Sequence, residues 1–142
     1  SMGKETSKFR LLHIMIRVLN LENSIDFYTR HLGMSVLRRT DYSDGKFTLV
    51  FVGYGNEKID TVIELTHNWD ETEPYEIGSG FGHLAVAVPN IYETCDQMRL
   101  EGVTISREPG PMKHGKSVIA FIEDPDGYKV ELIERDWFSI CL

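Results

Sequence analysis

The sequence predicts an α+β fold in which two βαβββ modules form curved mixed sheets. The first observation is a duplication: the segment HIMIRVLNL at residues 13–21 aligns with HLAVAVPNI at residues 83–91, and the His, Val and Asn match at a constant spacing of 70 residues. The second is a helical stretch after each copy, and the third is a set of three strand-like runs after each helix. A repeat of this length indicates one supersecondary unit used twice.

Each helical stretch begins after an asparagine. Asn20 and Asn90 are the expected N-caps, and Glu93, three residues after Asn90, predicts a capping box. Apolar residues then recur at helical spacing and a glycine follows, as Leu21, Ile25, Tyr28 and Leu32 before Gly33, and as Ile91, Cys95 and Met98 before Gly102.

Three strand-like runs follow each helix, at residues 34–40, 46–52 and 61–66 and then at 103–107, 117–122 and 128–134. Turn-forming residues separate them at 43–45 and 124–127. We therefore expect a tag remnant and N-terminal tail at 1–8, a first module at 9–67, a linker at 68–82, a second module at 83–134 and a C-terminal tail at 135–142.

Composition limits the classes of function. The 142 residues are 42% hydrophobic and 26% charged, which is typical of a globular domain. The net charge of -7 argues against nucleic acid and anionic membranes as partners. Two cysteines make no disulfide framework, and no apolar run reaches the roughly 20 residues that span a bilayer. We expect a protein of the cytoplasm.

Strand parity places four polar residues on equivalent faces. His13 and Arg17 alternate with four aliphatic residues that we expect to pack against the helix, namely Leu12, Ile14, Ile16 and Val18. Glu64 and Glu131, each in a Glu-Leu pair of the last strand of its module, likewise lie opposite aliphatic neighbours. His67 has the opposite parity to Glu64 and is expected to be structural.

The set His13, Glu64, His83 and Glu131 predicts a metal site. A carboxylate inside a concave sheet is costly unless something pairs it, and a divalent cation does so. Two neutral imidazoles and two carboxylates neutralise a dication. Because no thiolate takes part, a site with open positions is favoured over a closed structural zinc site. The rival interpretation is that duplication left polar residues without a role.

The chain resembles the glyoxalase I family of the vicinal oxygen chelate superfamily, which has the glyoxalase/bleomycin resistance/dioxygenase fold. The motifs that carry the resemblance run from about Phe9 to Glu134 and are LLHIMIRV, SIDFYTRHLGM, LVFVGYG, VIELTHNW, FGHLAVAV and AFIEDPDGYKVELIE. The resemblance implies a carbon–sulfur lyase of methylglyoxal detoxification. Its substrate would be the hemithioacetal of methylglyoxal and glutathione, isomerised to S-lactoylglutathione by metal-assisted proton transfer through an enediolate.

The resemblance also implies roles for single residues. His13, Glu64, His83 and Glu131 match the metal ligands, and Glu131 matches the catalytic base, with Glu64 as its symmetric counterpart for the other substrate stereoisomer. Arg17 and Asn68 match residues that hold glutathione. The longer enzymes of the family have a second substrate arginine where this chain has Ser79. That contact would come from Lys113 or Lys116, or be absent.

The compact form resembles the bacterial-type class, which prefers nickel or cobalt to zinc. The family further implies a homodimer whose sites each take His13 and Glu64 from one chain and His83 and Glu131 from the other. Two rival functions remain open at this point. One is an extradiol dioxygenase that uses His13, His83 and Glu131, against which Glu64 argues by filling a fourth position. The other is a metal-free drug-binding resistance protein.

Overall fold

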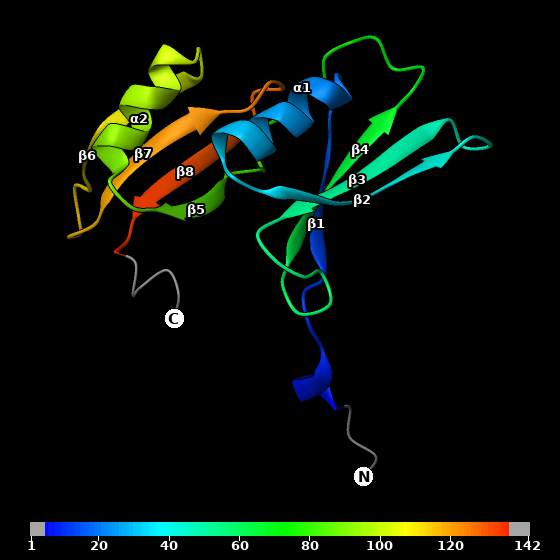
Figure 1. The fold of residues 1–142 in the computed structure, drawn as a ribbon, viewed down its shortest axis with the longest axis horizontal. Helices are drawn as coiled ribbons and strands as arrows, with labels where there is room; N and C mark the ends of the chain where they lie inside the picture. The colour runs from blue at the N-terminus through cyan, green and yellow to red at the C-terminus, as the bar shows by residue number, and fades with distance from the viewer. Residues whose placement is uncertain (1–4, 137–142) are drawn as a thin grey trace. The chain divides into compact units, whose positions relative to one another are not determined.

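A computed structural model describes residues 5–136 of the chain. The chain divides into two compact units, one up to Glu73 and the other from Pro74. Each unit contains one helix lying on one four-stranded sheet (Figure 1). Part of the expected C-terminal tail, including Trp137, lies outside the described residues.

Unit 1 contains one helical segment and four strands after a short 3-10 turn, η1. Its sheet has the order β1-β4-β3-β2. Strands β1 and β4 are parallel, whereas β3 runs antiparallel to both of its neighbours, β4 and β2. The elements are η1 (Thr6–Lys8), β1 (His13–Arg17), α1 (Leu21–Asp26), η2 (Phe27–His31), β2 (Ser35–Tyr42), β3 (Phe47–Gly53) and β4 (Val62–Asn68).

Unit 2 repeats this arrangement. Its sheet has the order β5-β8-β7-β6, again with the first and last strands parallel and adjacent. The elements are β5 (Leu84–Val88), α2 (Ile91–Leu100), β6 (Thr104–Pro111), β7 (Val118–Glu123) and β8 (Lys129–Glu134). The predicted α+β fold with two βαβββ modules is confirmed, because each unit has one strand, one helix and three further strands in chain order, all four strands in one sheet.

The helix of unit 1 begins as the sequence predicts. The Asn20 side chain accepts a hydrogen bond of 3.0 Å from the backbone N–H of Asn23. After Asp26 the helix widens into the π-helical segment η2, in which the Leu32 N–H reaches the Phe27 carbonyl. Gly33 follows with φ of 73°, a left-handed conformation that glycine adopts without strain. Tyr28 of this segment is fully buried against the sheet.

The capping box predicted for the second helix is wrong. Asn90 has φ of 47° and its side chain makes no capping hydrogen bond. A carboxylate from the last strand acts instead: Glu134 accepts a hydrogen bond of 3.0 Å from the N–H of Ile91. The left-handed backbone turns the Asn90 side chain away from the helix start. Spacing along the sequence could not reveal a cap supplied by a residue 43 positions away.

The predicted packing of β1 is half right. Ile16 and Val18 are buried, as expected of residues beneath the helix. Leu12 and Ile14 are not, with 55% and 41% of their surfaces exposed. Both precede the buried residues along this edge strand, and alternation places them on its helix side. The start of β1 therefore presents aliphatic side chains that its own helix leaves uncovered.

The core of each unit lies between its helix and its sheet. Fully buried aliphatic residues come from the central strands, with Val50, Val52 and Leu65 in unit 1 and Ile122, Val130 and Leu132 in unit 2. Cys95, a residue of α2, is buried. Desolvation, followed by repulsion from Glu108, raises the pKa of its thiol. Among the described helices, neither length nor hydropathy is sufficient to cross a membrane.

Candidate functional site

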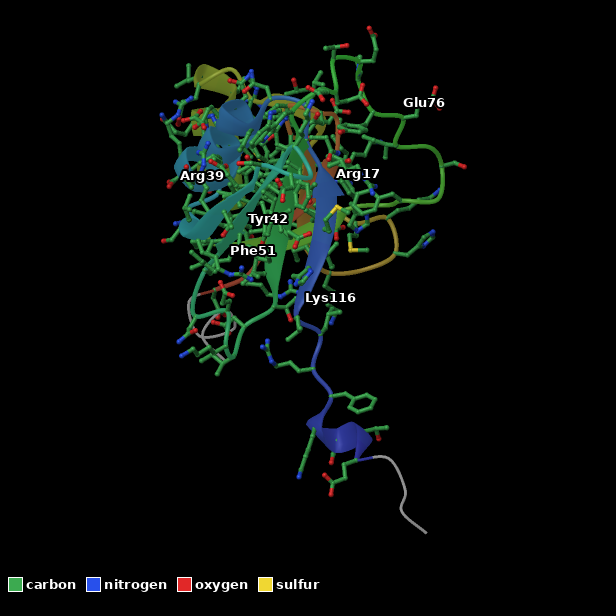
Figure 2. All side chains as sticks on the ribbon, turned by 90° about the vertical axis from the view of Figure 1, so that its right-hand side faces the viewer. Arg17, Arg39, Tyr42, Phe51, Glu76 and Lys116 are labelled. Atoms are coloured by element: carbon green, nitrogen blue, oxygen red, sulfur yellow. The ribbon has the colours of Figure 1, made fainter. Side chains whose placement is uncertain are left out.

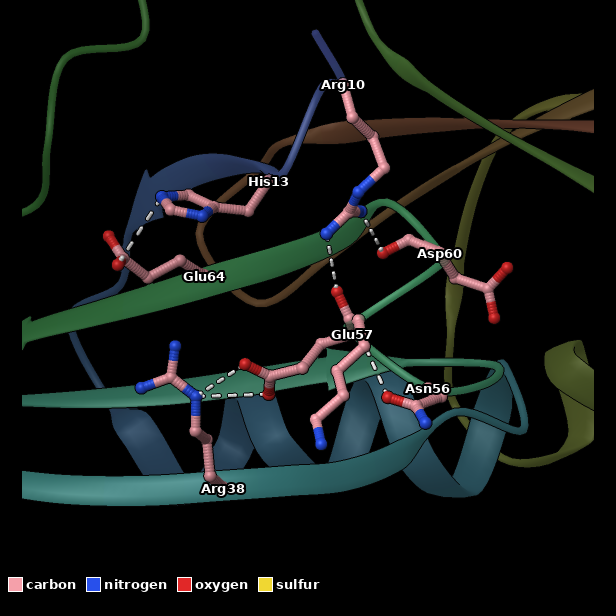
Figure 3. A network of polar contacts seen from close by, with 8 residues as sticks. Arg10, His13, Arg38, Asn56, Glu57, Asp60 and Glu64 are labelled. Carbon is pink, nitrogen blue, oxygen red and sulfur yellow. Dashed lines mark hydrogen bonds and ion pairs between the residues drawn. The ribbon is translucent and has the colours of Figure 1, made fainter. Parts of the chain in front are cut away.

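In unit 1, a histidine and a glutamate meet on the sheet face opposite the helix. His13 begins β1 and Glu64 lies in the middle of β4, and the parallel pairing of these strands brings the two together. His13 Nε2 lies 3.7 Å from Glu64 Oε1 (Figure 3). The Glu64 side chain is only 14% exposed, so water contributes little to holding its charge.

Unit 2 repeats the pair with nearly the same geometry. His83 directly precedes β5, Glu131 lies in β8, and His83 Nε2 is 3.4 Å from Glu131 Oε1. The Glu131 side chain is again 14% exposed, and the His83 side chain is 42% exposed. The predicted strand parity of all four residues is thus realised within the units.

The spacing within each pair suits two ligands of one ion. Imidazole nitrogens and carboxylate oxygens bind such ions at about 2.0–2.2 Å, which puts two neighbouring donors about 3.0–3.4 Å apart. The observed separations exceed an ordinary hydrogen bond and are close to this value. Each unit supplies a pair, and residues 5–136 contain no group of three or more His, Cys, Asp or Glu side chains placed to hold a metal ion.

A phenylalanine orients the histidine of each pair. Phe51 lies opposite Glu64 in the β3–β4 register, and its ring meets His13 edge-on with centroids 5.4 Å apart. Phe121 lies opposite Glu131 in the same way and meets His83 at 5.2 Å. The edge-on geometry restricts the imidazole plane without occupying either ring nitrogen. Neither phenylalanine was among the site residues predicted from the sequence, although their equivalent places in the repeat could have revealed them.

An arginine follows the phenylalanine in each register row. Arg38 lies opposite Phe51 and stacks on its ring at 3.7 Å, while its Nε donates to the Glu57 carboxylate at 2.8 Å (Figure 3). Arg107 lies opposite Phe121 but bonds instead to backbone carbonyls, of Ile119 at 2.7 Å and of Gly110 at 3.1 Å. The arginine at this position therefore contacts the phenylalanine beside the His–Glu pair in unit 1. In unit 2 it binds backbone carbonyls at an irregularity of β6.

The residues expected to bind glutathione occupy different parts of the units. Arg17 ends β1 (Figure 2) and Asn68 ends β4. Alternation places each on the same face as the metal-ligand candidate of its strand. Lys113 and Lys116 lie in the exposed loop between β6 and β7, which is closed by a hydrogen bond from the Met112 N–H to the Ser117 carbonyl.

Each unit also has a hollow. In unit 2 a cavity of about 480 Å³ adjoins His83 and is lined by Phe121 and by Lys129, a residue that the sequence analysis did not single out. In unit 1 a shallower hollow of about 430 Å³ is lined by His67 and Trp69. His67 has the opposite parity to Glu64, as predicted, so this second hollow lies on the helix side of the sheet.

Known proteins resemble the chain over most of its length. A lactoylglutathione lyase of Neisseria meningitidis is 60% identical over 126 residues, which are 89% of this chain and 91% of that protein. One of Escherichia coli O157:H7 is 54% identical and covers 89% and 93%.

Solved structures agree with these relatives. Glyoxalase I from Zea mays superposes with a TM-score of 0.84 at 45% identity, over 89% of this chain and 44% of the maize chain, so this chain spans less than half of that protein. The trypanothione-dependent glyoxalase I of Leishmania major superposes with a TM-score of 0.80 at 45% identity, over 89% and 87%. TnmS3, an antibiotic-binding protein from Streptomyces, is 20% identical and shares the fold.

The sequence model of one family matches residues 10–132, which include both units and both His–Glu pairs. With this match, the duplicated topology and relatives at 60% identity, the chain belongs to the Glyoxalase/Bleomycin resistance protein/Dioxygenase superfamily.

Proposed function

We propose that this protein is a lactoylglutathione lyase, which isomerises the hemithioacetal of methylglyoxal and glutathione to S-lactoylglutathione. The observation that carries the proposal is the pair of His–Glu sets, found at equivalent places on the open faces of both sheets. Relatives of that name at 54–60% identity over nine-tenths of the chain favour this activity over a dioxygenase or a drug-binding protein.

His13, Glu64, His83 and Glu131 would together hold one divalent ion per site. Their donors are two neutral imidazoles and two carboxylates, which balance a dication. Such an ion would act as a Lewis acid that stabilises the negative charge developing on the two substrate oxygens. The resemblance to the bacterial-type class supports nickel or cobalt over zinc.

Glu131 is the proposed base. It takes the proton from the substrate carbon that bears both sulfur and the hydroxyl and returns it to the adjacent ketone carbon. The hydroxyl proton passes to the former ketone oxygen, so the sulfur-bearing carbon becomes the thioester carbonyl and no redox partner is needed. The intervening species is an enediolate of the substrate. Glu64 occupies the equivalent position in unit 1, so we assign it the same role toward the other stereoisomer. Arg17, Asn68 and the loop residues Lys113 and Lys116 provide contacts for glutathione.

The four proposed ligands come from both units. We assign the site to a homodimer in which His13 and Glu64 of one chain join His83 and Glu131 of the other. Support comes from the edge strand β1. Leu12 and Ile14, the residues before and after His13 in the sequence, are both exposed. Uncovered aliphatic side chains on an edge strand are typical of a contact surface. The absence of a disulfide framework in the sequence favours the cytoplasm.

The central test is Glu131→Gln in protein stripped of metal and then supplied with nickel, cobalt or zinc. Isomerisation, followed by thioester absorbance, should fall by about two to four orders of magnitude because the base is lost. Metal content measured on the same sample should be largely retained, since three ligands and an amide oxygen remain. Glu93→Gln, on the exposed face of α2, is the control. Near-normal turnover by Glu131→Gln would contradict the assignment of the base.

A further inference from the structure

The cavity of unit 2 combines apolar walls with a single ammonium group. Phe81, Phe121 and Ile77 form its apolar walls, and His83 lies at one side. Its volume of about 480 Å³ lies within the range of cavities that hold small ligands. Since His83 acts as a neutral metal ligand under the proposed function, Lys129 is the one lining residue that carries a positive charge.

Glycines form part of the lining of this cavity. Gly78 and Gly127 both line it and have φ of 74° and 93°, a backbone conformation that side chains rarely adopt. A Cβ added at Gly127 would contact Ile77 Cδ1 at 3.7 Å.

Lys129 is the first residue of β8 and lies two positions before Glu131, so both side chains emerge on the same face of the sheet. Two residues along a strand are separated by about 7 Å. Glu123 lies opposite Lys129 in the β7–β8 register, yet no ion pair or hydrogen bond involves the Lys129 ammonium within the described part of the chain. The ammonium is available to a ligand.

We propose that Lys129 binds a carboxylate of the substrate's glutathione part inside this cavity and thereby determines which thiol the enzyme accepts. The inference rests on the proposed function, because that function supplies a ligand with two terminal carboxylates. A substrate whose reacting carbon lies at Glu131 needs to extend only about 7 Å along the strand to reach the ammonium.

The test compares Lys129→Gln and Lys129→Arg with the unaltered chain, each loaded with the same metal. Three methylglyoxal adducts are used: those of glutathione, of its glycine ethyl ester, and of 4-aminobutyryl-Cys-Gly, which lacks only the glutamyl carboxylate. We expect Lys129→Gln to lower kcat/KM for the glutathione adduct by about 10–100-fold, mostly through KM, as expected for loss of a charged contact. Lys129→Arg should recover most of the loss.

The analogues identify the carboxylate. The effect of Lys129→Gln should shrink to less than about threefold with whichever analogue lacks the contacted group. Equal losses with all three adducts, or no loss with glutathione, would overturn the inference. Lys46→Gln, in unit 1 and ion-paired with Asp70, is the matched control.

A binding measurement separates this inference from the proposed function. Calorimetric titration with S-hexylglutathione should show the same relative weakening in Lys129→Gln, and this readout needs no turnover. If the unaltered metal-loaded chain does not isomerise the glutathione adduct, the proposed function fails, whereas weakened thioether binding still supports the role of Lys129. If turnover is normal and thioether binding is unchanged in Lys129→Gln, the role of Lys129 alone is wrong.

Discussion

Arg38 and Arg107 show how duplicated residues acquire different tasks. Both lie one strand beyond a phenylalanine that contacts a candidate metal-binding histidine. Arg38 is half exposed, and its stabilising contacts are one ring and one carboxylate. Arg107 donates to four backbone carbonyls, of Glu108, Gly110, Pro111 and Ile119, where the β6–β7 register shifts. The two arginines therefore should contribute unequally to the free energy of unfolding, although their positions in the repeat are equivalent.

We expect Arg107→Met to lower the free energy of unfolding by about 2–3 kcal/mol, because the carbonyls at the β6 irregularity lose charged donors. Arg38→Met, at the matched position of unit 1, should cost less than about 1 kcal/mol, since exposed ion pairs and cation–π contacts are weak. Urea unfolding followed by circular dichroism measures both. A larger loss for Arg38→Met would refute this ranking.

Residue-scale prediction from the sequence succeeded where parity and repetition were sufficient. His13 and Glu64 were located because alternation fixes a side chain's face once its strand is known. Lys129 follows from the same rule applied to Glu131, so the signal was present, but nothing marked this lysine among the others of the chain. Its significance lies in the cavity, whose walls come from segments distant in sequence.

At the scale of elements, the two helix starts illustrate different solutions to the same problem. Free N–H groups in the first turn need acceptors. Asn20 supplies one locally, whereas α2 takes its acceptor from Glu134 at the end of β8. Local sequence was sufficient to predict the first cap, and tertiary structure overrode the second prediction.

Substitution of the two asparagines should have different effects on stability. Asn20→Ala should destabilise the protein by about 1 kcal/mol, since the side-chain acceptor is lost. Asn90→Gly should be neutral or stabilising by a few tenths of a kcal/mol, because its side chain caps nothing and glycine tolerates the positive φ. Thermal unfolding of both variants provides the comparison. Equal destabilisation by both substitutions would show that Asn90 acts as a cap after all.

Each unit presents one His–Glu pair, and the proposed sharing of a site between two chains predicts complementation between inactive chains. If His13→Ala and Glu131→Gln chains are mixed, unfolded and refolded together, the heterodimer contains one site with neither defect. Isomerase activity should recover to about a quarter of normal, since half of the dimers in a random mixture are mixed and each has one intact site.

A second mixture controls for this result. His13→Ala combined with Glu64→Gln places a defect in unit 1 of both chains, so neither shared site is intact and activity should remain absent. Mass spectrometry or differential tagging confirms that heterodimers have formed. Absence of recovery in the first mixture, with heterodimers present, would count against sharing of sites between chains.

Prediction at this scale was limited in a different way. The repeat predicted two similar sheets, and the structure confirms their topology. The exposure of Leu12 and Ile14 was not foreseen, because binary patterning marks a residue as apolar without saying which surface covers it. Tertiary packing decides which surface covers it, and the local sequence pattern does not contain that information.

The parallel pairing of the first and last strands also governs when the pairs can form during folding. His13 meets Glu64 across β1 and β4, and His83 meets Glu131 across the end of β5 and β8, so each contact closes nearly the whole chain of its unit. Such long-range contacts carry the largest loop-closure cost and form late. A nascent or partly folded unit has no paired donors to offer an ion. Under the proposed function, each pair can therefore contribute to metal binding only once its module is complete.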